Sequence, residues 1–116
     1  MKVNQSSAEE YQWGAGCLGW RLVNRTEISV IRERMPSGTS EVRHYHLKSR
    51  QFFFILQGQA RIELNGEQIP LAKDDGLEIP PGVPHQIFND AREPLEFLLV
   101  SQPSTTGDRV QEPREG

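Results

Sequence analysis

Three histidines, the only ones in the chain, lie at spacings that suit a metal site. His44 and His46 are two residues apart, so on a β-strand their side chains project from the same face with Cα atoms about 7 Å apart. Two imidazoles at that separation converge on one ion, and a first-row divalent metal with nitrogen ligands takes about four to six donors. The third and fourth donors must come from elsewhere in the chain, and His85 is the remaining histidine.

Each of these residues also has a plainer interpretation. A single histidine on an apolar strand is more often a hydrogen-bonded core residue than a ligand, and His85 also suits an ordinary loop. Three histidines at matching spacings favour the metal.

The elements that must position these residues are short β-strands separated by turns. No stretch keeps a 3.6-residue apolar period over three turns, so the sequence predicts an all-β barrel or sandwich. We expect an N-terminal arm or extra strand in residues 1–19, the barrel in residues 20–101 and a flexible tail in residues 102–116. The expected strands are residues 29–35, 42–46, 51–57, 60–64, 76–79, 86–89 and 95–101.

The clearest local signals are a hairpin and a strand with two apolar faces. Asn65-Gly66 is the pair that best tolerates the positive φ angles of a type I′ turn. In residues 51–57, Phe53 and Ile55 point one way while Phe52, Phe54 and Leu56 point the other. One face fills the barrel, and a second copy of the chain in a homodimer is expected to cover the other. The alternative cover is the N-terminal segment with Trp13 and Trp20.

Composition limits the partners and the compartment. The chain has 116 residues and a formal charge of -3, with acids and bases interspersed, so we expect no nucleic-acid partner. Cys17 is alone and no disulfide can form within the chain, which suits a reducing compartment. The start of the chain has no apolar run typical of a signal peptide, and the longest apolar run, residues 52–56, is too short for a membrane span. These features predict a cytoplasmic protein with no membrane partner.

Two segments resemble the motifs of the cupin family. Gly38-x5-His44-x-His46-x4-Gln51-x6-Gly58 is similar to the first cupin motif, with Gln51 where the family usually has Glu. Pro80-x-Gly82-x2-His85-x3-Asn89 is similar to the second motif, whose leading glycine position is occupied by Asp74. The resemblance implies a small single-domain cupin, a jelly-roll-like double-stranded β-helix. It also implies that His44, His46, Gln51 and His85 surround one divalent ion. Gln51 offers a neutral carbonyl oxygen, which binds a divalent ion more weakly than a carboxylate, so it ligates the metal, forms a hydrogen bond nearby or has no role in the site.

The turns between these residues suggest how they meet. Residues 47–50 let the chain reverse, so we expect Gln51 beside the histidine pair on the neighbouring antiparallel strand. Pro80, Pro81, Gly82 and Pro84 are expected to form a rigid loop that delivers His85 from the opposite side.

Neutral ligands would leave the charge of the ion uncompensated, so the site should attract a carboxylate, enolate or enediolate. Manganese, iron, cobalt, nickel, copper and zinc all suit such a donor set, and cupins use most of them. Three functions remain open: a metal-dependent oxygenase, isomerase or lyase; a module that binds a small molecule; and a barrel that has lost its metal. An apolar pocket lined by Phe53, Ile55, Ile87 and Phe88 would favour the enzyme.

No second set of catalytic groups is evident in the sequence. The acidic cluster Asp74, Asp75 and Glu78 lies in a turn and strand start, where solvated carboxylates are expected. Arg43, Arg50 and Arg61 are expected to face solvent or form ion pairs. Cys17 lies outside the motifs, so covalent catalysis is not supported.

Overall fold

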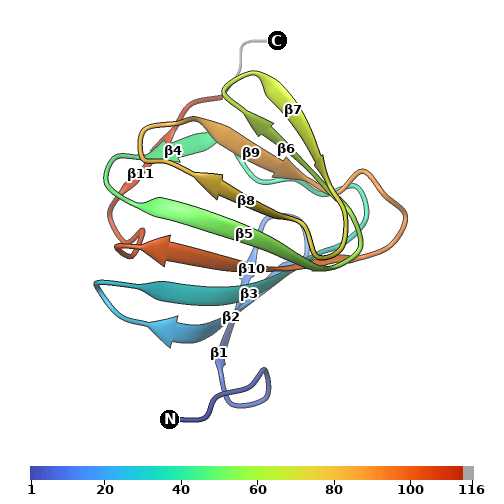
Figure 1. The fold of residues 1–116 in the computed structure, drawn as a ribbon. Helices are drawn as coiled ribbons and strands as arrows, with labels where there is room; N and C mark the ends of the chain where they lie inside the picture. Colours follow the sequence, from blue (N-terminus) through green and yellow to red (C-terminus); the bar gives the residue numbers. More distant parts are fainter. Residues whose placement is uncertain (114–116) are drawn as a thin grey trace.

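Two antiparallel β-sheets face each other across a common core (Figure 1). The structure is a computed structural model and describes residues 1–113. The strand order is β1-β2-β3-β10-β5-β8 in the first sheet and β11-β4-β9-β6-β7 in the second. No helix occurs in residues 1–113, so the all-β prediction is confirmed.

All seven predicted strands are present, and their ends lie within two residues of the prediction. The first sheet contains β1 (Glu9–Trp13), β2 (Cys17–Asn24), β3 (Ser29–Met35), β5 (Arg50–Gln57), β8 (Gly76–Ile79) and β10 (Leu95–Gln102). The second contains β4 (His44–His46), β6 (Ala60–Leu64), β7 (Glu67–Leu71), β9 (His85–Phe88) and β11 (Arg109–Gln111). Strands β2 and β11 were not predicted, and β7 was expected only as the second arm of the Asn65-Gly66 hairpin.

The hairpin between β6 and β7 forms as predicted. Asn65 and Gly66 have φ angles of 48° and 94°, and Leu64 pairs with Glu67 across the turn. Positive φ at both central positions is the requirement of a type I′ turn, which matches the twist of the flanking strands. This turn fixes the register of the second sheet at its β7 edge.

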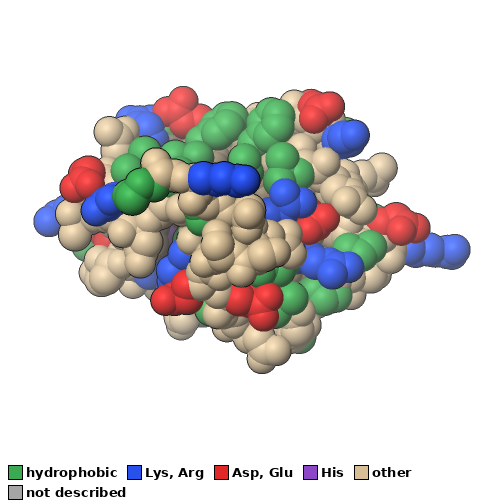
Figure 2. Space-filling view, turned by 90° about the horizontal axis from the view of Figure 1, so that it is seen from below, with side chains coloured by type: hydrophobic (Ala, Val, Ile, Leu, Met, Phe, Trp, Pro, Cys, Tyr) green, Lys and Arg blue, Asp and Glu red, His purple; other side chains and the backbone are tan. Residues whose placement is uncertain are grey.

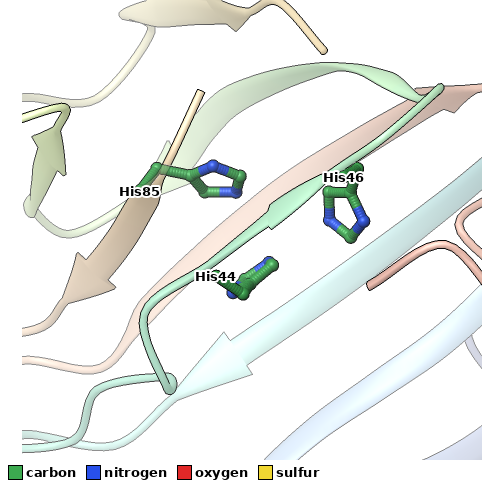
Figure 3. A group of neighbouring side chains, drawn as sticks. All are labelled: His44, His46 and His85. Atoms are coloured by element: carbon green, nitrogen blue, oxygen red, sulfur yellow. The ribbon is translucent and has the colours of Figure 1, made fainter. Parts of the chain in front are cut away.

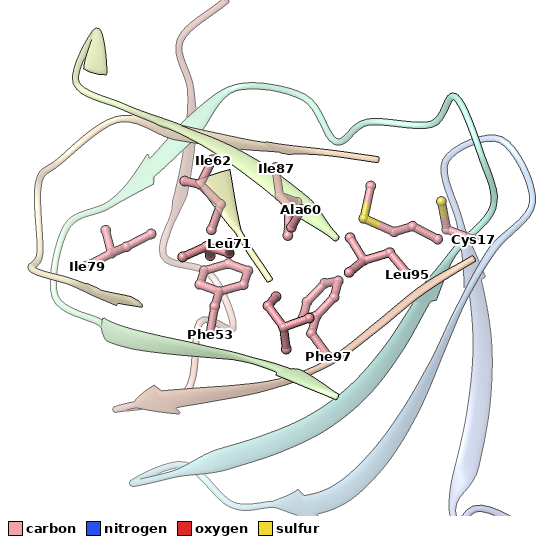
Figure 4. Close-up of a cluster of buried hydrophobic side chains, with 11 residues drawn as sticks. Cys17, Phe53, Ala60, Ile62, Leu71, Ile79, Ile87, Leu95 and Phe97 are labelled. Atoms are coloured by element: carbon pink, nitrogen blue, oxygen red, sulfur yellow. The ribbon is translucent and has the colours of Figure 1, made fainter. Parts of the chain in front are cut away.

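The core lies between the sheets and is built from the alternate side chains that point inward (Figure 4). Phe53 and Ile55 of β5 are buried and pack with Phe97 of β10, whose ring centroid lies 5.5 Å from that of Phe53. Phe52, on the other face of β5, is 40% exposed. The predicted division of this strand into two faces is therefore confirmed.

The N-terminal hairpin extends the first sheet at its edge. Strands β1 and β2 add beside β3, and they carry Trp13 and the buried Trp20. Because these strands continue the sheet, the two tryptophans do not lie over the outer face of β5. The alternative cover for Phe52 is therefore not what the structure shows.

Part of the segment expected to be a flexible tail is an ordered strand in the structure. β11 pairs with β4 through Val110 opposite Tyr45, and the Glu112 amide donates to the Arg43 carbonyl over 2.9 Å. The last residues of the expected tail, 114–116, lie outside the described residues. The segment therefore contributes an edge strand to the second sheet.

The surface carries both signs of charge. On the face seen from below, acidic and basic side chains alternate with hydrophobic ones (Figure 2). Residues 1–113 contain no helical segment with the length and hydropathy needed to cross a bilayer.

Candidate metal centre

The structure brings the three histidines together at one end of the barrel. His44 and His46 project from β4, and His85 projects toward them from β9 (Figure 3). One ring nitrogen of each lies within 4.8 Å of those of the other two. The ring centroids of His44 and His85 are 4.6 Å apart, and those of His44 and His46 are 4.9 Å apart. All three side chains are buried, so the cluster is part of the barrel interior.

Two expectations about how the candidate ligands meet are wrong. His85 comes from the strand adjacent to β4, directly opposite His44 in the register, and not from the opposite side. Gln51 lies on β5 in the other sheet, and not on a strand paired with β4. The physical reason is that residues 47–49 carry the chain from one sheet to the other instead of closing a hairpin.

Backbone carbonyls set the tautomer of each ring. The Nδ1 atoms of His44, His46 and His85 lie 2.7, 3.2 and 3.0 Å from the carbonyl oxygens of Val42, Asp108 and Val83. A carbonyl oxygen can only accept, so Nδ1 carries the proton and donates. In a neutral ring the lone pair then lies on Nε2, which is the atom a metal binds.

Burial keeps these rings neutral. It lowers the pKa of His44 to about 3 and that of His85 to about 4. Burial also lowers the pKa of His46. At neutral pH the three Nε2 atoms are therefore lone-pair donors without competition from protons.

Three buried polar atoms at this end of the barrel lack a partner. His46 Nε2, His85 Nε2 and Gln51 Oε1 have no hydrogen-bond partner among the described residues. Gln51 donates from Nε2 to Ser101 Oγ over 3.1 Å, which leaves its carbonyl oxygen available. Because unpartnered buried polar atoms cost free energy, such a set fits a site that is completed by an ion.

A cavity of about 290 Å³ opens beside His44, His46 and Gln51. Its other lining residues are Tyr11, Trp13, Arg21, Ile31, Glu33, Glu41, Leu99, Ser101, Thr105 and Arg109. The expected apolar lining is wrong, because Phe53, Ile55 and Ile87 belong to the packed core. The Arg61 guanidinium lies over the ring of Phe88, and its Cζ atom is 3.9 Å from the ring centroid.

Two acids in this cavity, the buried Glu33 and the partly buried Glu41, were missed by the sequence analysis. Burial raises the pKa of Glu33 to about 7, and burial together with the charge of Glu33 raises the pKa of Glu41 to about 8. Glu41 Oε2 lies 4.0 Å from His44 Nδ1. Glu33 had a signal in the sequence, since it occupies an inward position of the predicted strand 29–35 between Ile31 and Met35. Glu41 precedes β4 and had none.

The arginines singled out in the sequence form ion pairs, as expected. Arg50 contacts Glu78 over 2.6 Å and Arg61 contacts Asp90 over 2.7 Å, both at the surface. The buried guanidinium of Arg43 contacts Glu63. None of the residues in these pairs lines the cavity.

Asp108 ties the C-terminal segment to the turn that follows β4. Its carboxylate accepts hydrogen bonds from the backbone amides of Leu47, Lys48 and Ser49 at 2.9 to 3.2 Å. Burial works against the ionised form, but these amide bonds outweigh it and hold the pKa of Asp108 below its usual range. The same residue supplies the carbonyl that accepts from His46, so the turn, the tail and a candidate ligand are joined.

Comparisons with known proteins agree with this arrangement. The sequence model of one protein family, described as the cupin domain, matches residues 31–101. An uncharacterized protein of Methanocaldococcus jannaschii is 35% identical over 75 residues, which are 65% of this chain and 60% of that protein. An oxalate-binding protein of Thermotoga maritima is 32% identical over 69 residues, which are 60% of this chain and 57% of that protein. The chain thus spans about three fifths of these relatives.

Among solved structures, the nucleoside dehydratase Pac13 of Streptomyces superposes with a TM-score of 0.82 at 18% identity. The match covers 100% of this chain and 93% of Pac13. At this identity the likeness shows a shared fold.

The Asp108 contacts generate a prediction about stability. Asp108→Ala removes the acceptor of three backbone amides in the turn after β4, so we expect a loss of about 1–3 kcal/mol in the free energy of unfolding. Amide hydrogen exchange of β11 should also become faster, because its anchor to β4 is weakened. Lys48→Ala is the control, since the Lys48 side chain is exposed and its backbone amide is unchanged. Equal stability of the two variants would contradict this role of Asp108.

Proposed function

Because the chain belongs to the cupin family and has its double-stranded β-helix fold, we propose that it binds one divalent transition metal ion on His44, His46 and His85, with Gln51 as a fourth ligand. The observation that carries this proposal is the set of three Nδ1–carbonyl bonds, which leave the Nε2 lone pairs free in three neutral rings that have a ring nitrogen each within 4.8 Å of one another. Manganese, iron, nickel, cobalt, copper and zinc all suit these donors.

We propose further that the protein is a metal-dependent enzyme of the dioxygenase or isomerase type that acts on a small polar or enolisable compound. When bound, the ion supplies a Lewis acid that polarises an oxygen of the substrate. The cavity beside His44 and His46 supports this proposal. It contains the buried Glu33 and the partly buried Glu41, which have the pKa range of groups that exchange protons near neutral pH.

A second function, a module that binds a small acid without converting it, is favoured by one relative. The Thermotoga maritima protein is named as oxalate-binding, and it is 32% identical over 69 residues. An ion held by neutral ligands retains its charge and would attract such an anion. The two functions share the metal and differ in turnover.

Metal content tests the site directly. We expect about one transition metal ion per chain in protein purified without chelator after metal-supplemented growth, measured by elemental analysis. His85→Ala should lose the metal, because a nitrogen ligand is removed, whereas Gln51→Glu should keep or gain it, because a carboxylate binds more strongly. Tyr45→Phe is the control, since Tyr45 lies between the two histidines and faces away from them. Absence of metal from the wild type would favour a barrel that has lost its ion.

Turnover separates the enzyme from the binder. An oxygenase should consume oxygen with small enols or diketones, and an isomerase should change the proton NMR spectrum of its substrate. Either activity should disappear in His85→Ala while the fold is retained. Saturable binding of one of these compounds, with neither oxygen consumption nor a change in its NMR spectrum, would support the binding module instead.

We also propose a homodimer that buries the outer face of the first sheet. Phe52 is 40% exposed, and its ring stacks on that of Phe54 with the ring centroids 6.3 Å apart. On β10, Val100 pairs with Phe52 and Leu98 pairs with Phe54. An apolar area on an exposed sheet face is typical of a surface that meets a second copy.

Sedimentation velocity tests the dimer. Wild-type protein should sediment as a dimer, and Phe52→Asp should sediment as a monomer because a charge would be buried at the interface. Phe52→Leu, which keeps an apolar side chain, should remain dimeric. A wild-type monomer across the concentration range would overturn this proposal.

A further inference from the structure

Tyr11 reaches across a neighbouring strand to a buried acid in the cavity. Tyr11, Gly19 and Glu33 are successive partners on β1, β2 and β3. A Cβ at Gly19 would lie 2.2 Å from Cζ of Tyr11, so only glycine lets the ring cross β2 at this place. The Tyr11 hydroxyl then donates to Glu33 Oε1 over 3.3 Å. The sheet is therefore shaped to hold a phenol and a carboxylate together beside the cavity.

The charge of Arg109 acts on both acids of the cavity without a direct contact. Neither Glu33 nor Glu41 forms an ion pair with an arginine or lysine within the described residues. Glu41 accepts from the Ile87 amide through Oε1 over 3.1 Å. Buried carboxylates are costly unless their oxygens are satisfied by hydrogen bonds. A ligand that donates hydrogen bonds from hydroxyl groups would satisfy the remaining lone pairs of Glu33 and Glu41.

The candidate metal ligands that line the same cavity have a different need. The buried Gln51 has an unpartnered carbonyl oxygen, and His46 has an unpartnered Nε2. An ion bound there would make the space between these ligands positive, and Arg109 lines the same cavity. This space suits an anionic group, while the wall of Tyr11, Glu33 and Glu41 disfavours a second anion by repulsion.

The size of the cavity limits the ligand. A volume of about 290 Å³ equals roughly ten water molecules in the liquid, which is space for a ligand of about that many heavy atoms. Trp13 and Leu99 add apolar surface for the carbon chain of such a ligand.

From these contacts we infer that the ligand is a small monocarboxylic acid with several hydroxyl groups, held by its carboxylate at the metal ion and by its hydroxyls at Tyr11, Glu33 and Glu41 in the same cavity. This inference rests on the proposed metal site and names its substrate class. Tyr11 and Arg109 lie outside residues 31–101, the segment that matches the family. The preference for hydroxyls thus depends partly on parts of the chain that the family match does not include.

Three six-carbon acids test the inference on zinc-loaded protein. Hexanoate has no hydroxyl, 2-hydroxyhexanoate has one beside the carboxylate, and gluconate has hydroxyls along the chain. Calorimetric titration should show gluconate binding at least about tenfold tighter than 2-hydroxyhexanoate, since one or two hydrogen bonds of ordinary strength give that factor. Comparison with 2-hydroxyhexanoate removes the contribution of chelation by the first hydroxyl. Zinc content is measured after each titration, because gluconate also binds free zinc.

Variants locate the preference in the wall. Tyr11→Phe and Glu33→Leu should each bring gluconate down to the affinity of 2-hydroxyhexanoate and leave hexanoate unchanged. Tyr45→Phe, which removes a phenol on the opposite face of β4, should keep the preference, and thermal unfolding checks that each variant is folded. Equal or absent binding of gluconate by wild-type protein that retains zinc overturns the inference alone. Failure to retain zinc overturns the proposed function and the inference with it.

Discussion

Three hydrogen bonds from imidazole Nδ1 atoms to backbone carbonyls determine what this end of the barrel can do. Val42 and Val83 each lie two residues before the histidine that they hold, so the entries into β4 and β9 orient those rings. The third carbonyl belongs to Asp108, which lies 62 positions beyond His46. Because burial keeps the rings neutral, each bond leaves a lone pair on Nε2. Strand entry, burial and the C-terminal segment must all be correct for the lone pairs to meet.

The register of the first sheet separates the site from the core. On β5 and β10, Gln51 pairs with Ser101, Phe53 with Leu99 and Ile55 with Phe97. Polar side chains thus meet at one end of the barrel and apolar side chains in its middle. A shift of one residue would turn every one of these side chains to the other face, so the packing of Phe53 and Phe97 also holds Gln51 at the cavity.

Much of the fold could be predicted because its signals are local. Asn65-Gly66 carries the φ requirement of its turn, and the alternation around Phe53 depends only on strand geometry. The spacing of His44 and His46 likewise depends on one strand. Strand β11 could not be predicted, because three residues hold no period and the anchor at Asp108 depends on amides about 60 positions away.

The placement of the fourth candidate ligand shows the same limit. A turn-like sequence at residues 47–50 suggested a hairpin, but whether the chain reverses or crosses to the facing sheet is decided by distant pairings such as Phe53 with Leu99. Glu33 was visible as an acid on an apolar face, whereas its contact with Tyr11 needs the register of three strands. Non-local pairing is the information that one sequence lacks.

The position of Asp108 in the chain has a consequence for synthesis. The ribosome makes His44, His46 and His85 before Asp108, so a nascent chain exposes every imidazole while the acceptor of His46 is still absent. The hydrogen bond that orients the ring of His46 can form only once β11 has paired with β4. This end of the barrel therefore depends on a segment that is synthesised after all three histidines.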